Sequence, residues 1–160
     1  MSTRNCETHD TEIGRICQRA VVTIGPDADI TAAAQLMRRA HVGFLIVCDE
    51  PDDRGQRVVG VLTDRDVVVA VIAHDADPHT LQVMDVMTRN PLIVSEDCPL
   101  DATLAFMRDA GVRRVPVVGS HERLVGVLSL DDVVEKLARQ LNDIAGAFRR
   151  EQRAERMSRP

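Results

Sequence analysis

The ten residues Val59–Val68 read Val-Gly-Val-Leu-Thr-Asp-Arg-Asp-Val-Val, and they return 66 positions later, over Val125–Val134, as Val-Gly-Val-Leu-Ser-Leu-Asp-Asp-Val-Val. Only three positions differ, and the exchange of Thr63 for Ser129 keeps the hydroxyl. An internal repeat decides the architecture, because each copy buries its apolar face against a neighbouring copy. The two strings therefore predict a duplicated unit and a duplicated site.

The repeat extends outward from these strings over most of the chain. With a shift of 70 positions, residues 13–48 align with residues 83–118 without a gap. The shift then falls to 66, because the first copy carries four extra residues in the segment 49–57. Pro51 and Gly55 predict that this segment is a surface turn.

Each copy is predicted to fold as strand, helix, strand, strand and helix. Apolar residues at helical spacing and runs rich in β-branched residues indicate these elements. The expected ranges are 21–24, 29–40, 44–48, 58–62 and 64–73 in the first copy, and 92–94, 100–110, 115–118, 124–128 and 130–141 in the second. Because so small a sheet is unstable alone, the copies should pack together. The predicted class is α/β (α+β), with two β-α-β-β-α units related by pseudo-two-fold symmetry.

Four segments follow from this pattern. We expect a polar N-terminal segment over residues 1–12, the first unit over 13–78, the second over 79–141, and a C-terminal helix with a basic tail over 142–160. Short helices are expected at 13–17 and 80–87, ahead of the two copies. Residues 149–160 contain five Arg and two Glu. They are interpreted as a frayed, solvated helix end, and the alternative is a helix for assembly or partner docking.

Composition excludes several classes of protein. The 160 residues are 44% hydrophobic but only 2% aromatic, and the net charge is −5. Nucleic-acid binding normally needs a basic surface and stacking aromatics, so it is not expected. No apolar stretch approaches the roughly 20 residues that span a bilayer, and the polar N-terminus lacks a signal core, so a cytoplasmic location is expected. The four cysteines lack CxxC spacing and are expected to be free thiols, and a metal is not expected.

Four motifs together resemble the CBS domain, which occurs as tandem pairs called Bateman modules. They are Gly60–Asp66, Gly126–Asp132, Asp85-Val-Met-Thr88 followed by Pro91, and Gly111-Val-Arg-Arg-Val-Pro-Val117. The resemblance covers about residues 13–141 and implies a stand-alone regulatory pair rather than an enzyme. It further implies an adenosine-containing ligand (AMP, ADP, ATP, NAD or S-adenosylmethionine) in clefts between the units, a homodimer stacked through helices, and a regulated protein as a possible partner.

The residue chemistry suits a nucleotide. A carboxylate in the first helical turn can accept both ribose hydroxyls, and Asp66 and Asp132 hold that place. The hydroxyls of Thr63 and Ser129 lie where a strand passes into a helix, and the exposed N–H groups there favour phosphate. The candidate cations are Arg65, Arg113 and Arg114, and the candidate aliphatic walls for adenine are Val61, Val127, Ile24 and Val94.

Two alternatives remain open at this point. A hydroxyl followed three residues later by an acidic residue is also a helix capping box, so the protein could be a ligand-free structural or dimerisation scaffold. Arg113 and Arg114 could form salt bridges instead of binding phosphate. The first copy has Gly43 and Phe44 where the second has these arginines, so two related sites of unequal affinity are expected. An enzyme is disfavoured, because no Gly-rich phosphate loop or catalytic triad motif is present.

Overall fold

The structure is a computed structural model that describes residues 12–158, with side chains up to residue 151. The expected polar segment 1–12 therefore lies almost entirely outside the described residues. By its internal contacts the chain divides into two compact units that differ from the two repeat copies. The first unit ends at Leu128 and contains the sheets of both copies, and the second begins at Ser129.

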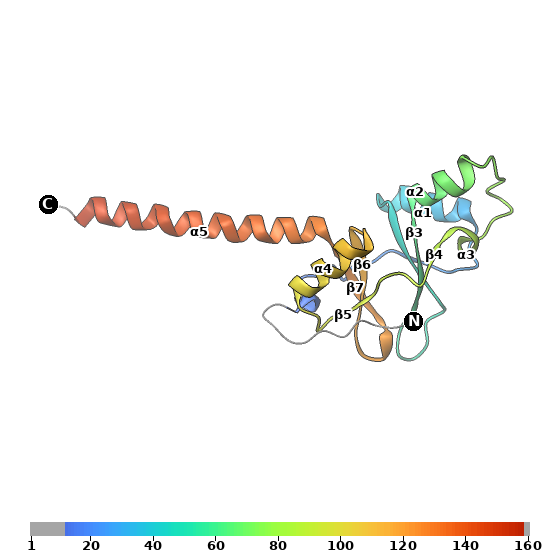
Figure 1. The fold of residues 1–160 in the computed structure, drawn as a ribbon, viewed down its shortest axis with the longest axis horizontal. Coiled ribbons are helices and arrows are strands. Elements are labelled where there is room, and N and C mark those ends of the chain that lie inside the picture. Colours follow the sequence, from blue (N-terminus) through green and yellow to red (C-terminus); the bar gives the residue numbers. More distant parts are fainter. Residues whose placement is uncertain (1–11, 159–160) are drawn as a thin grey trace. The chain divides into compact units, whose positions relative to one another are not determined.

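The first copy of the repeat contributes three strands and two helical segments. Its strands are β1 (Thr23–Ile24), β2 (Phe44–Cys48) and β3 (Val58–Thr63). Helix α1 (Ile30–Ala40) lies between β1 and β2, and α2 (Asp64–Val67) follows β3 directly and continues as the π-helix η2 (Val68–Ile72) (Figure 1). Strand β1 runs parallel to β2, and β2 runs antiparallel to β3. The expected order of elements is confirmed.

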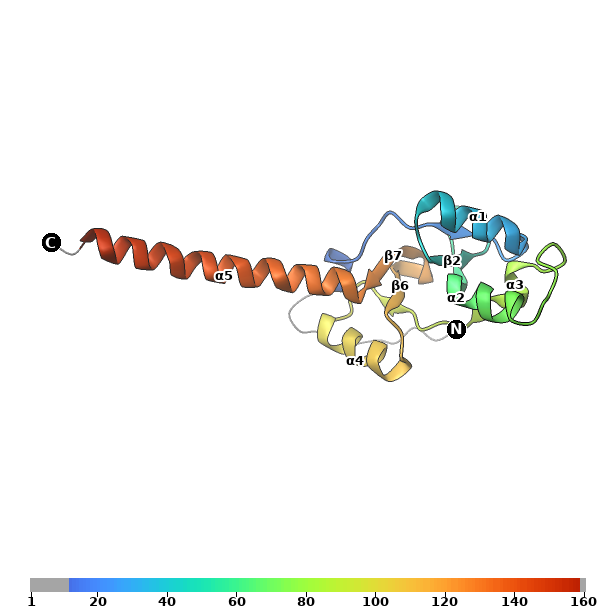
Figure 2. The same ribbon diagram turned by 90° about the horizontal axis from the view of Figure 1, so that it is seen from above.

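The second copy forms its own sheet. The strand order is β5 (Val94–Ser95), β6 (Arg114–Val118) and β7 (Leu124–Ser129), with β5 parallel to β6. Helix α4 (Leu100–Ala110) covers this sheet as α1 and α2 cover the first (Figures 1 and 2). A 3-10 turn, η3 (Ser120–Glu122), joins β6 to β7. The predicted class, two small sheets flanked by helices, is confirmed.

The short helices that precede the strands of each copy are shorter than expected. Helix α3 covers only Val83–Val86, and η1 only Ile13–Arg15. The residues after α3 form the unexpected strand β4 (Thr88–Arg89), which pairs antiparallel with β3 and so completes a four-stranded first sheet. The second sheet is extended in the same way by a residue that precedes the first copy: Gln18 exchanges backbone hydrogen bonds of 2.9 Å with Val127 of β7. Each copy therefore receives its last pairing from the segment that precedes the other copy.

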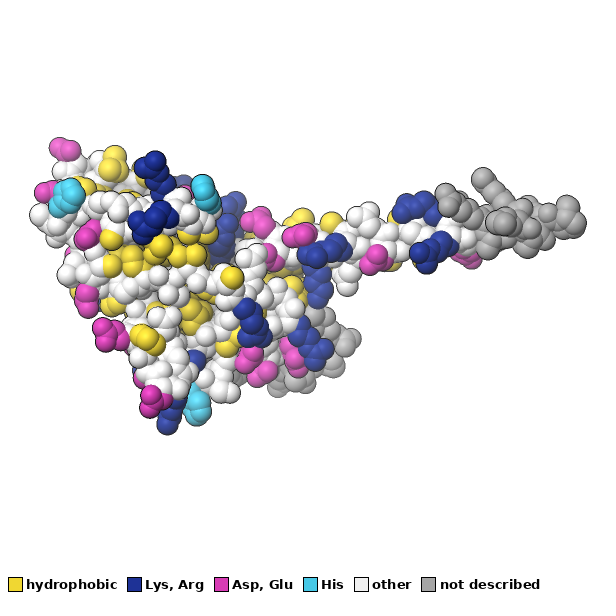
Figure 3. Space-filling model, turned by 180° about the vertical axis from the view of Figure 1, so that it is seen from behind, with side chains coloured by type: hydrophobic (Ala, Val, Ile, Leu, Met, Phe, Trp, Pro, Cys, Tyr) yellow, Lys and Arg dark blue, Asp and Glu magenta, His cyan; other side chains and the backbone are white. Residues whose placement is uncertain are grey.

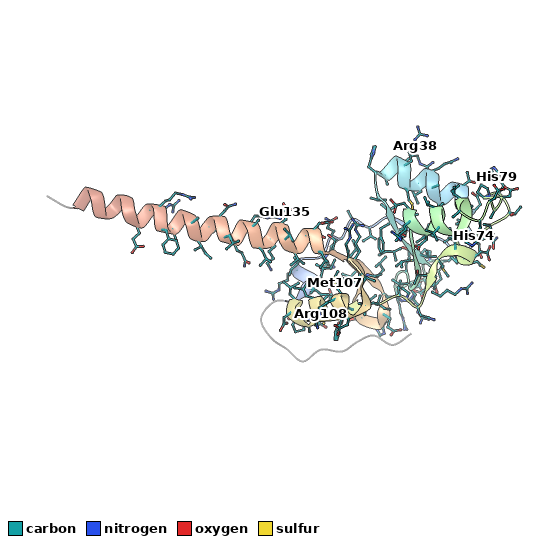
Figure 4. The ribbon with its side chains drawn as sticks, turned by 45° about the horizontal axis from the view of Figure 1, so that its top comes forward. Arg38, His74, His79, Met107, Arg108 and Glu135 are labelled. Atoms are coloured by element: carbon teal, nitrogen blue, oxygen red, sulfur yellow. The ribbon has the colours of Figure 1, made fainter. Side chains whose placement is uncertain are left out.

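Helices α1 and α4 begin and end by the same local rules. The Asp29 side chain accepts a hydrogen bond of 2.6 Å from the Ala32 N–H and so caps α1. At the other end, His41 adopts the left-handed conformation with φ of 53°, and the equivalent Gly111 does so after α4 with φ of 66°. Buried Met107 and exposed Arg108 are neighbours on α4, which places the boundary between core and solvent between them (Figure 4).

Strand β2 is buried on both faces, which explains its uninterrupted apolar sequence. On one face, Leu45 and Val47 pack with α1 and with Val83 from the segment before the second copy. On the other face, Ile46 and Cys48 form a second cluster, whose members from both copies are Ile46, Cys48, Val58, Ile93 and Val118. The two copies thus share a core.

The second unit is one helix, α5 (Leu130–Ser158), of 29 residues. It joins the helix expected over 130–141 to the expected C-terminal helix without a break, because apolar residues continue at helical spacing through Phe148 and no Pro interrupts the backbone hydrogen bonds. No helix among residues 12–158 is both long and apolar enough to cross a membrane.

The expectation of four free thiols is corrected at one position. Cys17 and Cys48 are buried thiols that form no disulfide. Cys98 is disulfide-bonded. The prediction for Cys6 lies outside the described residues.

Candidate functional site

A cavity of about 660 Å³ opens in the first unit where residues of both copies meet. This volume falls within the range of roughly 300–1,000 Å³ that small-molecule sites occupy. The walls come from the end of β3, the start of α2, the starts of β2 and β6, and the segment before β5. The lining residues are Gly43, Phe44, Val61, Thr63, Asp64, Arg65, Asp66, Thr88, Pro91, Leu92, Gly111, Val112, Arg113, Arg114 and Pro116.

Thr63 and Asp66 form a closed capping box at one wall of the cavity. The Thr63 N–H and its hydroxyl donate to Asp66 Oδ2 at 2.8 and 2.7 Å, and the Asp66 N–H donates back to Thr63 Oγ1 at 3.1 Å. Both donors reach the same carboxylate oxygen. No hydrogen bond from the described residues engages Asp66 Oδ1, so the cap leaves one oxygen of this carboxylate for a ligand.

Three arginines give the cavity its positive charge. Arg65 comes from the first turn of α2, Arg113 precedes β6, and Arg114 begins it. Arg65 and Arg113 are exposed and make no salt bridge with any residue in the described part of the chain. Arginine binds phosphate oxygens through paired N–H donors. The structure therefore brings the arginines of the second copy beside Thr63 and Asp66 of the first.

One wall of the cavity is apolar and contains an aromatic ring that the sequence reasoning missed. Phe44 begins β2 and is half-buried, and Val61 and Leu92 also line this region. In the repeat alignment, Phe44 corresponds to Arg114 and Gly43 to Arg113, and all four line the same cavity. That correspondence is the signal that could have placed Phe44 here, because equivalent positions near the two-fold axis of a repeat lie close to one another.

Gly43 makes room for an acidic side chain at the cavity. A Cβ at this position would lie 2.6 Å from Asp64 Oδ2. The Asp64 N–H donates to the Gly43 carbonyl at 3.1 Å, which holds the two backbones together. Asp64 is exposed and adds a negative charge beside Arg65, so this cavity is lined by side chains of both signs.

Three of the predicted adenine walls do not line this cavity. Val94 is fully buried in β5. Ile24 packs against the core of the first copy, and Val127 packs against the core that the copies share. Leu92, two residues before Val94, lies at the cavity instead.

Ser129 and Asp132 repeat the same capping box at the start of α5. The Ser129 N–H donates to Asp132 Oδ2 at 3.1 Å, and the Asp132 N–H donates to Ser129 Oγ at 3.1 Å. Ser129 is buried. The local geometry of the motif is thus duplicated together with its sequence.

The histidines and the paired arginines of α1 lie away from the cavity. His74 and His79 are exposed in the segment that follows η2, and Arg38 points into solvent (Figure 4). The described residues contain no group of three or more His, Cys, Asp or Glu placed to hold a metal ion.

The comparisons with known proteins agree on one family. The CBS domain profile matches residues 13–73 and 83–139. Hypoxic response protein 1 of Mycobacterium tuberculosis is 34% identical over 122 residues, which are 76% of this chain and 82% of that protein. An uncharacterized protein of Methanopyrus kandleri, MK0525, is 27% identical over 77% of this chain, and the chain spans only 61% of its length.

Solved structures share the fold. Hypoxic Response Protein I with two coordinated zinc ions has a TM-score of 0.68 and 32% identity, over 78% of this chain and 98% of that one. The CBS domain pair of protein MJ0100, in complex with 5-methylthioadenosine and S-adenosyl-L-methionine, has a TM-score of 0.68 and 25% identity, over 81% of this chain and 98% of that one.

Proposed function

Because this chain belongs to the CBS domain family, we propose that it is a regulatory module that binds an adenosine-containing ligand in the cavity beside Thr63 and Asp66. AMP, ADP, ATP, NAD and S-adenosylmethionine are the candidate ligands. The observation that carries the proposal is the meeting of a first-turn carboxylate, three arginines and an apolar wall in one cavity. The complex of the MJ0100 pair with two adenosine derivatives supports the ligand class.

Each part of such a ligand has a matching surface. Asp66 Oδ1 accepts hydrogen bonds from the ribose hydroxyls. Arg65 and Arg113 pair with phosphate oxygens at the exposed side. The adenine ring lies against Phe44 and Val61, where stacking on the aromatic ring adds to the burial of apolar area. Ser129 and Asp132 are proposed to form a second, related site of different affinity.

The module signals by changing conformation rather than by catalysis. A ligand shifts a conformational equilibrium only through different affinities for the two states, so a second conformation or a partner protein completes the function. We propose that the chain acts as a homodimer through its CBS helices and in the cytoplasm. Disulfides such as the one at Cys98 are uncommon in the cytoplasm. The mass of the protein isolated from inside the cell, measured with and without reductant, shows whether Cys98 is disulfide-bonded there.

Calorimetric titration of the full chain with AMP, ATP, NAD and S-adenosylmethionine tests the ligand class. We expect at least one of them to bind below millimolar concentration and to raise the melting temperature. Release of copurifying small molecules and their identification by mass spectrometry gives an independent measurement. Binding of none of the four, with no adenosine compound released, contradicts the proposal.

Substitution of Asp66 must separate ligand binding from helix capping, and Asp85 offers a matched control. Asp85 Oδ2 accepts from the Gln82 N–H at 2.9 Å, the same cap that Asp66 makes at 2.8 Å, but Asp85 does not line the cavity. Asp66→Ala and Asp85→Ala should each cost roughly 1 kcal/mol of stability through lost capping. Only Asp66→Ala should abolish the shift in melting temperature that the nucleotide produces.

A scaffold without a ligand is the second candidate, since both capping boxes are complete within the protein. In that case Asp66→Ala and Asp85→Ala behave alike, and no nucleotide changes the melting temperature of the parent chain.

A further inference from the structure

Helix α5 carries a continuous stripe of exposed apolar side chains. Five of the large hydrophobic residues that the structure leaves exposed lie on this helix, with exposed fractions between 49% and 67%. Their spacing alternates between three and four residues, which is the seam of a paired helix rather than the broader face of a helix packed on a sheet. The stripe consists of Val134, Leu137, Leu141, Ile144 and Phe148.

We propose that α5 pairs with α5 of a second copy of this chain, antiparallel, through this stripe. The proposal does not depend on the ligand, and it names α5, whose first residues belong to the second CBS domain, as an interface helix of the homodimer.

The positions of the apolar residues match an antiparallel pair of helices whose two-fold axis crosses the seam at the level of Arg139. In that register Leu137 of one helix lies opposite Leu141 of the other, and Val134 lies opposite Ile144. Phe148 then meets Leu130, which is half-buried. Every residue of the stripe finds an apolar partner, so the register follows from the sequence of one helix alone.

The residues beside the stripe are compatible with close approach. Ala138 and Ala145 flank the seam on one side, and Gln140 and Ala147 flank it on the other. None of these four is charged, so the two-fold axis brings no like charges together at the edge of the seam. Small flanking residues also allow the two backbones to lie close to one another.

The charges of α5 favour the antiparallel direction. Residues 130–143 contain four acidic and two basic side chains, whereas residues 144–158 contain four basic and two acidic ones. Figure 3 shows Lys and Arg near the grey end of the helix, where Arg149 and Arg150 are exposed. In the antiparallel pair Arg149 approaches Asp131 of the other copy. In a parallel pair, Arg149 and Arg150 of one chain would lie beside Arg149 and Arg150 of the other chain, and these like charges would repel.

The pairing also accounts for the length of the helix. The seam from Leu130 to Phe148 is about 28 Å long at 1.5 Å per residue. Most helical stability in proteins comes from packing of an apolar face, and an isolated helix is marginal in water. Gly146 lowers the intrinsic helix propensity of α5 further, by about 1 kcal/mol relative to Ala. A second α5 supplies the missing apolar contact.

Self-association of the full chain tests the interface, with neighbouring positions as matched variants. Leu141→Glu places a charge in the seam, whereas Asn142→Glu places the same residue one position away on the outer face. By sedimentation equilibrium we expect Leu141→Glu to raise the dissociation constant of self-association at least ten-fold and Asn142→Glu to leave it within two-fold. Equal behaviour of the two variants, or a parent chain that is monomeric at all concentrations, overturns the proposal.

A distance measurement tests the direction of the pair. Spin labels attached at Arg150→Cys lie about 33 Å apart along the helix axes in the antiparallel register, since each is eleven residues from the two-fold axis. In a parallel pair they lie within about 15 Å of one another, at the interaxial distance plus the label arms. The parent chain, labelled identically, reports any signal from native cysteines. A short distance, or no intermolecular distance because α5 packs on its own chain, overturns the antiparallel pair.

Discussion

Ile13 and Val83, at equivalent positions of the two copies, each donate a backbone hydrogen bond to the opposite copy. The Ile13 N–H reaches the carbonyl of Cys98 at 3.0 Å, and the Val83 N–H reaches that of Ala28 at 2.8 Å. Both side chains are fully buried. The segment that leads into each copy is therefore part of the other copy's fold. These two hydrogen bonds link the two copies on either side of the cavity.

Gly126 is predicted to tolerate alanine less well than its repeat equivalent Gly60. A Cβ at Gly126 would lie 2.5 Å from the backbone oxygen of Gln18, in the exchanged segment. A Cβ at Gly60 would meet the end of the Met87 side chain at the same distance, and that side chain can move. We expect Gly126→Ala to cost roughly 1–3 kcal/mol and Gly60→Ala clearly less.

Chemical denaturation of both variants measures this difference. An unchanged slope with a lower midpoint identifies a true loss of stability. Equal losses at the two glycines would show that the backbone of the exchanged segment yields as readily as a methionine side chain.

Arg123 is predicted to hold the loop of residues 49–57 in place. Its guanidinium is largely buried, donates to the Gly55 carbonyl at 3.2 Å and forms an ion pair with Asp52. Hydrogen bonds to a charged group contribute roughly 1.5–3 kcal/mol. Arg123→Ala should therefore speed tryptic cleavage after Arg54 by about ten-fold, measured by mass spectrometry of the fragments. Arg38→Ala, on an exposed helix face, is the control and should leave the rate unchanged.

Much of the fold is predictable from local patterns. The apolar run Phe44–Cys48 became β2 with the same bounds, and α4 covers the expected 100–110, because periodicity and helix ends are encoded by adjacent residues. Strand β4 was not predicted, since pairing with β3 involves residues far away in the chain. The π-helical turn Val68–Ile72 carries no local signal either.

The candidate site was predictable only in part, and for the same reason. The repeated motif identifies Thr63 and Asp66 as a pair, because their spacing spans one helical turn. Which arginine approaches them depends on how the copies pack, and the sequence reasoning could not assign Arg113 to a cavity. Phe44 was missed because an aromatic residue at a strand start reads as core.

Cys48 is predicted to be inert towards thiol reagents. Burial in the shared core, assisted by the charge of Asp49, raises the pKa of this thiol to about 12. The thiolate is the reactive form, so at pH 8 the folded protein should leave Cys48 unmodified by iodoacetamide, and denaturant should expose it. Because the unfolded thiol ionises near pH 9, the folded state should lose stability between that pH and pH 12. Rapid alkylation in the native state would show that the core opens.

Arg113 is predicted to recognise the phosphate of a ligand and not its adenosine. It is exposed at the cavity and has no ion pair with a described residue, so its removal leaves the fold intact. Loss of a charged hydrogen bond costs roughly 1.5–3 kcal/mol, which corresponds to at least a ten-fold change in affinity. In calorimetric titrations, Arg113→Ala should weaken AMP by that factor and leave adenosine unchanged, and Arg108→Ala should change neither. Equal weakening of AMP and adenosine would mean that Arg113 shapes the cavity instead of contacting phosphate, and an unchanged AMP affinity would place the phosphate at Arg65 or Arg114.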